Sequence, residues 1–248
     1  MNVAMMQPGF MPWPGLFELI YKSDIFIFLD DFQFSVQSYD QRNRMFIDKG
    51  RAGWYTIPVQ KSISFKAPLN KTGIHESLAW REKIWKRITF NYRGAPYFAQ
   101  MSPSINEWLF SVKGSLAELN MDFIKLVCSV LDLKPQFRIS SEYATDARRS
   151  RRVLELLRWC GAKRYFCARG SFDYMRKDNI FPVIDIEVLF QDYIYRPYKQ
   201  VGAVETFLPH LSILDALMNI GAKDTAELVQ NGTEKWATWQ EMAAACAT

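Results

Sequence analysis

The segment from residue 3 to residue 33 constrains the fold more than any other part of the chain. Residues 3–7 form an apolar run that ends at Pro8, and residues 9–15 form a loop rich in proline and aromatic residues. An apolar helical segment follows, and residues 25–29 form a second apolar run. Two strands joined by one helix run parallel, so their carboxyl ends lie at one edge of a sheet. Because ligands bind outside that edge in open α/β sheets, we predict a ligand site at the first loop.

Later patterns extend this unit into a doubly wound sheet. Short β-like runs begin near residues 137, 164 and 184, and the last of them is apolar on both faces, as in a buried parallel strand. Helical patterns separate most of these runs. We therefore predict an α/β fold with a mostly parallel sheet of about five strands and helices on both faces.

Residues 54–134 predict a mainly helical insertion within one domain of residues 1–248. Large residues recur at every fourth position in residues 76–92, which places them on one helical face: Trp80, Ile84, Ile88 and Tyr92. Ser115 and Glu118 have the spacing of a capping box, which predicts the start of another helix. Residues 35–53 are polar and predict a loop.

Two further helices are expected in the second half of the chain. Asp146 is the predicted cap of the first, which would run to Gly161. Ser212 and Asp215 suggest a capping box for the second, with Gly221 as its predicted end.

Composition limits the partners and the compartment. The formal net charge of +5 at pH 7 suits a small anionic ligand such as a nucleotide, phosphate or carboxylate. No zinc-finger, basic-zipper or RNP pattern accompanies the charge, so we expect no DNA partner. The four cysteines lie far apart, which predicts a reduced, cytoplasmic protein. Apolar runs far shorter than about 20 residues predict no membrane span, and two histidines without further ligands at zinc spacing predict no metal site.

The loop from Gln7 to Gly15 is the first candidate binding site. Its prolines stiffen the backbone, and Gly15 leaves room for a ligand or a neighbouring strand. The helix N-terminus just beyond it offers unpaired N–H groups and a partial positive charge, which suit an anion. The alternative is a turn with only a structural role.

Asp30 and Asp31 end the second apolar run at the same predicted edge. Adjacent strand residues point to opposite faces, so one carboxylate is expected to face the ligand while the other caps a turn. Such a carboxylate binds an amine, accepts its proton or holds a metal. In the alternative reading both are solvent-facing turn residues.

Arginine and tyrosine clusters supply further candidates. The Arg42-Asn43-Arg44 sequence has the forked donors that grip phosphate or carboxylate, although a solvated loop has the same composition. Tyrosines follow the last strong strand together with Gln200, and they suit stacking on a sugar or nucleotide or, alternatively, a lid: Tyr193, Tyr195 and Tyr198.

The chain resembles the WbqC-like family of bacteria. The matching positions, spread from residue 7 to beyond 220, are Gln7-Pro8, Pro12-Trp13, Gly15, Asp30 to Gln33, Arg42 to Arg44, Ala95 to Phe98, Ser140-Ser141-Glu142, Pro197-Tyr198, Gln200 and Leu211 to Asp215. The resemblance implies a role in O-antigen, other surface-polysaccharide or secondary-metabolite pathways, with aminoacylation such as glycine transfer to amino sugars. The chain departs from the usual pattern of the family at Ile84 and Cys167.

A second resemblance is architectural. The strand, loop, helix and strand also resemble pantothenate synthetase and related nucleotide-binding ligases. Those proteins carry two histidines in the loop, where this chain has Trp13 and Leu16. The absence of these two histidines argues against the adenylating chemistry of those ligases, although the chain can still share their architecture.

These observations lead to one expected function and two alternatives. The first is an enzyme that forms an amide by transferring an acyl or aminoacyl group to a small-molecule amine, either free or on a nucleotide-linked sugar. Its donor would be a free amino acid, a carrier protein or an aminoacyl-tRNA. The alternatives are an ATP-dependent ligase or nucleotidylyltransferase-like enzyme that uses Mg²⁺, and a non-catalytic protein that binds a small molecule.

The first hypothesis assigns roles to the candidate residues. Asp30 or Asp31 orients or deprotonates the amine, the loop from Gln7 holds an anionic part of the donor, and Arg42 and Arg44 neutralise developing charge. Substrate contacts are expected from Gln7, Pro12, Trp13, Gly15, Gln33, Arg42, Asn43, Arg44, Ser141, Glu142, Tyr198, Gln200 and Asp215.

Overall fold

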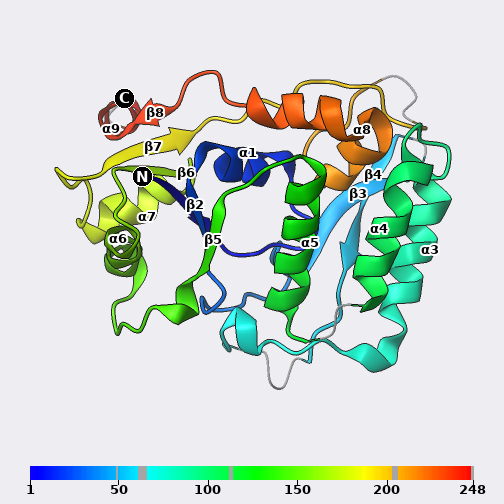
Figure 1. The fold of residues 1–248 in the computed structure, drawn as a ribbon, viewed down its shortest axis with the longest axis horizontal. Helices are drawn as coiled ribbons and strands as arrows, with labels where there is room; N and C mark the ends of the chain where they lie inside the picture. Colours follow the sequence, from blue (N-terminus) through cyan, green and yellow to red (C-terminus); the bar gives the residue numbers. More distant parts are fainter. Residues whose placement is uncertain (49, 61–65, 112–113, 203–205, 247–248) are drawn as a thin grey trace.

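A six-stranded mixed sheet forms the centre of the protein (Figure 1). This computed structural model describes residues 1–48, 50–60, 66–111, 114–202 and 206–246. In spatial order the strands are β5 (Gln136–Ile139), β2 (Ile25–Phe28), β1 (Asn2–Met6), β6 (Arg164–Ala168), β7 (Glu187–Gln191) and β8 (Ala237–Thr238). All neighbours pair in parallel except β8, which runs antiparallel to β7. The predicted mostly parallel α/β sheet is confirmed, with one short strand more than expected.

The strand order creates a switch point beside β1. From β1 the chain builds outward through β2 to β5, and it then returns to the other side of β1 for β6 and β7. The loops that leave β1 and β6 therefore diverge to opposite faces. In doubly wound sheets a crevice for ligands opens at this point.

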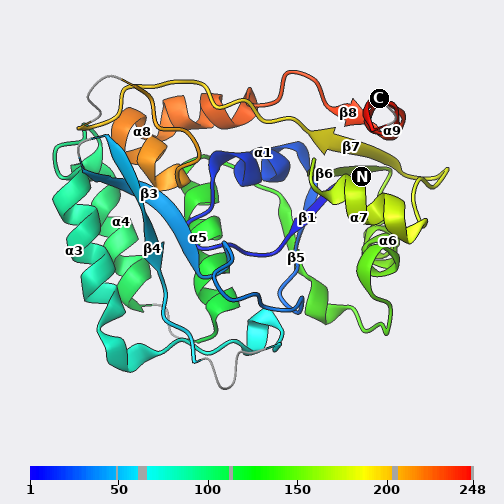
Figure 2. The same ribbon diagram turned by 180° about the vertical axis from the view of Figure 1, so that it is seen from behind.

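Helices cover both faces of the sheet, because residues of the central strands alternate between two cores. Ala4, Phe26 and Phe28 belong to the core that α1 (Pro14–Lys22) and α8 (Ile213–Gln230) complete. Their neighbours Val3 and Ile25 belong to a second core with α6 (Arg149–Trp159) and α7 (Ser171–Asp178). Helix α9 (Trp239–Ala245) also packs on this second core. Figure 2 shows α1 and α8 on one side of the central strands and α6 and α7 on the other.

Between β2 and β5, the described residues form a hairpin, two short 3-10 turns and three helices. The hairpin consists of β3 (Arg42–Asp48) and β4 (Arg51–Thr56), and the turns are η1 (Leu69–Lys71) and η2 (Glu76–Leu78). The helices are α3 (Trp80–Tyr92), α4 (Phe98–Ser111) and α5 (Leu116–Val130). Their apolar residues share the core of α1. The division into one domain with a helical insertion stays a prediction.

The structure corrects one predicted loop and confirms other elements. Residues 42–48 form β3 and residues 51–53 belong to β4, so the prediction of a loop across residues 35–53 was wrong in both places. Strand β3 is hard to recognise because its buried positions include Asn43, a polar residue. The helical face predicted from Trp80 to Tyr92 is buried, as expected. The capping box at Ser115 is also confirmed, with the Glu118 N–H donating to Ser115 Oγ at 3.2 Å.

Two predicted helix boundaries were wrong. Helix α6 begins at Arg149 and ends at Trp159, with Arg148 rather than Asp146 at the N-cap. Gly221 kinks α8 at φ 76° instead of ending it. A Cβ at this glycine would lie 2.6 Å from the ring of Tyr97, which explains why a side chain is not accommodated there. Across the described parts of the chain, no helix has the length and apolar character that a membrane span requires.

Candidate functional site

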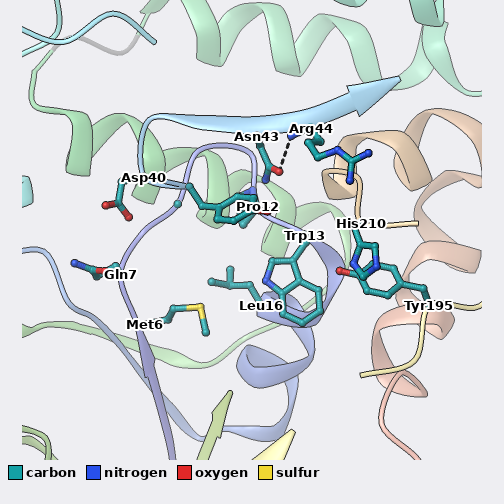
Figure 3. A pocket seen from close by; sticks show the side chains of 12 residues that line it. Met6, Gln7, Pro12, Trp13, Leu16, Asp40, Asn43, Arg44, Tyr195 and His210 are labelled. Atoms are coloured by element: carbon teal, nitrogen blue, oxygen red, sulfur yellow. Dashed lines mark hydrogen bonds between the residues drawn. The ribbon is translucent and has the colours of Figure 1, made fainter. Parts of the chain in front are cut away.

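A cavity of about 440 Å³ opens at the carboxyl end of β1, beside the switch point. Its size is within the range of ligand pockets, roughly 300–1,000 Å³. The first loop, the hairpin and two later segments line it (Figure 3): Met6, Gln7, Gly9, Pro12, Trp13, Leu16, Tyr39, Asp40, Asn43, Arg44, Tyr195 and His210. Five predicted binding residues are among them, namely Gln7, Pro12, Trp13, Asn43 and Arg44.

Two buried amides hold the loop that forms the cavity floor. Asn43 donates to the carbonyls of Phe10 and Met11 at 3.2 and 2.8 Å. Asn120 donates to the carbonyls of Pro8 and Asp40 at 2.8 and 2.7 Å. Because these bonds satisfy carbonyls that no secondary structure pairs, they fix an irregular backbone inside the protein. Asn43 therefore shapes the loop as well as lining the cavity.

Aromatic rings form one wall. The rings of Trp13 and Tyr195 have centroids 5.8 Å apart, and that of His210 lies 4.3 Å from that of Tyr195. Burial raises the pKa of Tyr195, so its hydroxyl stays protonated at neutral pH. The six-membered ring of Trp13 lies over Gly15, where a Cβ would come within 2.1 Å of it. The indole therefore covers the first turn of α1, where the sequence predicted an anion site.

The cavity carries one carboxylate and one guanidinium on different sides. Asp40 lies with Gln7 on one side in Figure 3, and Arg44 lies with His210 on the other. Asp40 is 6% exposed, and burial raises the pKa of its carboxyl although Ser38 Oγ donates to it at 2.8 Å. Within the described ranges, the guanidinium of Arg44 forms no ion pair or hydrogen bond. An ordered site with an unpaired cation and a basic carboxylate is suited to a polar ligand.

Comparison with known proteins identifies the family. A family model described as the WbqC-like protein family matches residues 7–227. The chain belongs to this family. It is also 31% identical over 228 residues to the uncharacterized protein Rv1507c of Mycobacterium tuberculosis, covering 90% of this chain and 95% of the relative. No solved structure matches the chain. The resemblance inferred from the sequence is confirmed.

In this WbqC-like protein the Asp30 and Asp31 carboxylates are not among the groups that line the cavity. Asp30 is 4% exposed and accepts hydrogen bonds from the Ser141 N–H at 3.0 Å and from Asn70 Nδ2 at 2.8 Å. Asp31 accepts from Ser140 Oγ at 2.5 Å and forms an ion pair with Arg152. These contacts tie the end of β2 to η3 (Ser140–Glu142) and α6. A catalytic role for either carboxylate stays a prediction.

Other family positions lie around the cavity or apart from it. Gln7 Nε2 donates to the Gln33 carbonyl at 3.4 Å, which connects the segments that follow β1 and β2. Arg42 stacks on Trp54 outside the cavity, with its guanidinium 4.2 Å from the ring centroid. Glu142 is exposed in η3.

Asp215 organises a separate buried cluster. Its carboxylate accepts hydrogen bonds from Tyr198 Oη at 2.7 Å, Gln200 Nε2 at 2.8 Å and Tyr92 Oη at 3.0 Å. Burial raises the pKa of Asp215. The cluster joins α3, α8 and the segment after β7, so these family positions hold the scaffold together. Ser212 caps α8 alone, because Asp215 turns to the cluster instead of completing the predicted capping box.

Sequence reasoning missed four cavity residues: Met6, Tyr39, Asp40 and His210. Gly9 lies in the predicted loop, and Leu16 was noted only as replacing a histidine. Asp40 lies just before β3 in the segment predicted as loop, and nothing in its sequence neighbourhood distinguishes it from a solvated acid. Tyr195 was recognised as a stacking candidate at the correct edge. The departures at Ile84 and Cys167 concern buried core residues away from the cavity.

Proposed function

We propose that this protein forms an amide by transferring an acyl or aminoacyl group to a small-molecule amine bound in the β1 cavity. The observation that carries the proposal is a single cavity that combines an aromatic wall, a buried carboxylate of raised pKa and an unpaired guanidinium. Family membership supports a biosynthetic role, because the resemblance implies aminoacylation of amino sugars in surface-polysaccharide or secondary-metabolite pathways.

The carboxylate of Asp40 suits the acceptor amine. Burial raises its pKa, so it is a stronger base than an exposed carboxylate. The amine nitrogen attacks the carbonyl carbon of the donor and the C–N bond forms. The bond from that carbon to the leaving oxygen or sulfur then breaks, and the proton passes from nitrogen to Asp40 and on to the leaving group. Asp30 and Asp31, predicted for this role from the sequence, remain the competing pair.

The aromatic wall suits a sugar acceptor. Trp13 and Tyr195 offer apolar ring faces for the C–H groups of a pyranose, and the protonated Tyr195 hydroxyl offers a donor for its oxygens. Gln7 and His210 add polar groups on opposite sides of the cavity (Figure 3). Such few, fixed polar groups within an apolar lining set the orientation of a small ligand.

A transfer assay tests this proposal. The purified protein is incubated with glucosamine and UDP-glucosamine as amines and with glycyl-tRNA or a glycyl carrier-protein thioester as donors. Mass spectrometry should detect an amine that has gained one glycyl group. Asp40→Asn should lower the turnover number by about 10²- to 10⁴-fold, the usual contribution of a general base. Asp31→Asn is the matched carboxylate control and should retain most activity.

The outcomes of this assay separate the hypotheses. Loss of activity in Asp31→Asn but not in Asp40→Asn would transfer the catalytic role to the Asp30-Asp31 pair. Binding of the amine without product from either donor would favour the non-catalytic binding protein.

The second candidate function is an ATP-dependent ligase, which the switch point beside β1 favours because doubly wound sheets bind nucleotides there. The same reaction with free glycine, ATP and Mg²⁺ would then release AMP or pyrophosphate. Product formation from the preformed donors without ATP would exclude this mechanism as the main activity.

A further inference from the structure

The outer face of the β3–β4 hairpin continues the cavity onto the protein surface. Arg42 and Arg44 are two residues apart in β3, so both side chains project from the same face, while Asn43 between them points into the core. Arg44 is paired with Trp54 in the hairpin register. Because Arg44 also lines the cavity, this face begins at the cavity wall.

The two guanidinium groups lack anionic partners. In the ranges that the structure describes, neither Arg42 nor Arg44 forms an ion pair, although most other described arginines do so or bond to a carbonyl. The Nε atom of Arg42 is buried and makes no hydrogen bond. Because the protein encloses this Nε–H, a ligand would contact the terminal nitrogens of the guanidinium groups instead. The forked geometry of arginine matches phosphate oxygens.

Two exposed aromatic rings lie beside these arginines. Tyr39 is 59% exposed and Trp54 is 39% exposed, so both rings present surface that a ligand can contact. Their centroids are 5.7 Å apart, and the Arg42 guanidinium lies 4.2 Å from the centroid of Trp54. Tyr39 lines the cavity as well. The planes of the two rings are tilted by 54°, and the pair adjoins both the arginines and the cavity mouth.

We propose that this face binds a nucleoside diphosphate, with Arg42 and Arg44 holding the phosphates and the tilted rings of Tyr39 and Trp54 packing against the base. Aromatic and guanidinium planes stack on bases in this way in many nucleotide-binding proteins. The cavity lies at the lower end of ligand-pocket sizes and holds the reacting end of a substrate, so the remainder extends across the hairpin. The inference rests on the proposed function, whose substrate it makes more specific.

Two substrates of an acyl transferase carry a nucleoside diphosphate. One is a nucleotide-linked amino sugar, in which the sugar enters the cavity as the acceptor. The other is a coenzyme A thioester, in which the adenosine diphosphate group binds the hairpin and the acyl group enters the cavity as the donor. Both present the same phosphates and a base to the hairpin, and direct binding measurements distinguish them.

Isothermal titration calorimetry with UDP, uridine, pyrophosphate, UDP-glucosamine and coenzyme A tests the proposal. UDP should bind, and both uridine and pyrophosphate should bind at least tenfold more weakly because each lacks half of the contacts. Arg42→Ala and Trp54→Ala should each weaken UDP binding by roughly tenfold or more, the loss of one stacking or charged contact. Tighter binding of UDP-glucosamine than of coenzyme A identifies the acceptor as the nucleotide-bearing substrate, and the reverse identifies the donor.

Matched variants keep the test decisive. Arg158→Ala removes an exposed arginine of α6, which is paired with Asp185 far from the hairpin, and should leave UDP binding unchanged. Trp54→Phe retains an aromatic ring and should bind UDP more tightly than Trp54→Ala. It replaces Trp54→Ala in the test if that variant folds poorly, and it should then bind UDP more weakly than the wild type. The proposal is overturned if neither UDP, UDP-glucosamine nor coenzyme A binds, if pyrophosphate binds as well as UDP, or if Arg42→Ala and Trp54→Ala bind like the wild type. Because binding is measured without turnover, this result is independent of whether transfer activity is found.

Discussion

At the scale of single residues, side-chain partners rather than burial distinguish the carboxylates at this edge of the sheet. Asp30 and Asp31 look alike in sequence, yet hydrogen bonds and an ion pair with Ser140, Ser141 and Arg152 occupy them. These partners lie more than 100 residues later in the chain, so no local pattern reveals them. Asp40 keeps access to the cavity while burial raises its pKa. Sequence spacing located the correct edge of the sheet, but not the carboxylate that lines the cavity.

The raised pKa of Asp40 also predicts a stability effect. The pKa of Asp40 is higher in the folded chain than in the unfolded chain. At pH values between these two pKa values, the carboxyl is therefore more protonated in the folded state. The free energy of unfolding attributable to this group therefore falls as pH rises through that window. Asp40→Asn should abolish this dependence and raise the free energy of unfolding at neutral pH, even as it lowers activity. Urea denaturation at pH 4 and pH 7 measures both effects, and a variant less stable than the wild type at pH 7 would contradict the account.

At the scale of elements, helix α8 depends on the backbone at Gly221. Its φ of 76° with ψ of −179° is a conformation essentially restricted to glycine, and Tyr97 occupies the space that a side chain would need. Gly221→Ala should lower the free energy of unfolding by about 1–3 kcal/mol or more. Gly170→Ala is the control, because a Cβ there meets nothing within 4 Å and should change stability little. Equal urea midpoints for the two variants would show that the kink is not strained.

Helix α3 and strand β3 differ in how well the sequence predicts them. The buried face of α3 was predictable because Trp80, Ile84 and Ile88 are apolar at helical spacing. Strand β3 was not predictable from the sequence. Arg42 and Arg44 lie on its outer face and Asn43 on its buried face, so its first residues do not alternate between apolar and polar. The residues that obscured the strand are those that we assign to ligand binding, and a functional surface replaces the usual pattern there.

At the scale of the whole molecule, parallel strands and helices on two faces were predictable from the chain, whereas the spatial order was not. The order β5-β2-β1-β6-β7 results from tertiary pairing and produces the switch point beside β1. The hairpin, the first loop and the segment after β7 meet there only in the folded protein. For this reason, the position of Tyr39, Asp40 and His210 in the cavity wall follows from the fold and could not be predicted from their neighbours in sequence.

The most direct test of the central claim is a crystal structure of the protein with UDP-glucosamine bound. The account predicts that the amine nitrogen lies within about 2.6–3.2 Å of an Asp40 carboxylate oxygen, the reach of a general base. The sugar should contact Trp13 and Tyr195, and the phosphates should contact Arg42 and Arg44. Density for the ligand at Asp31 and Ser140, or anywhere outside the β1 cavity and the hairpin face, would contradict it.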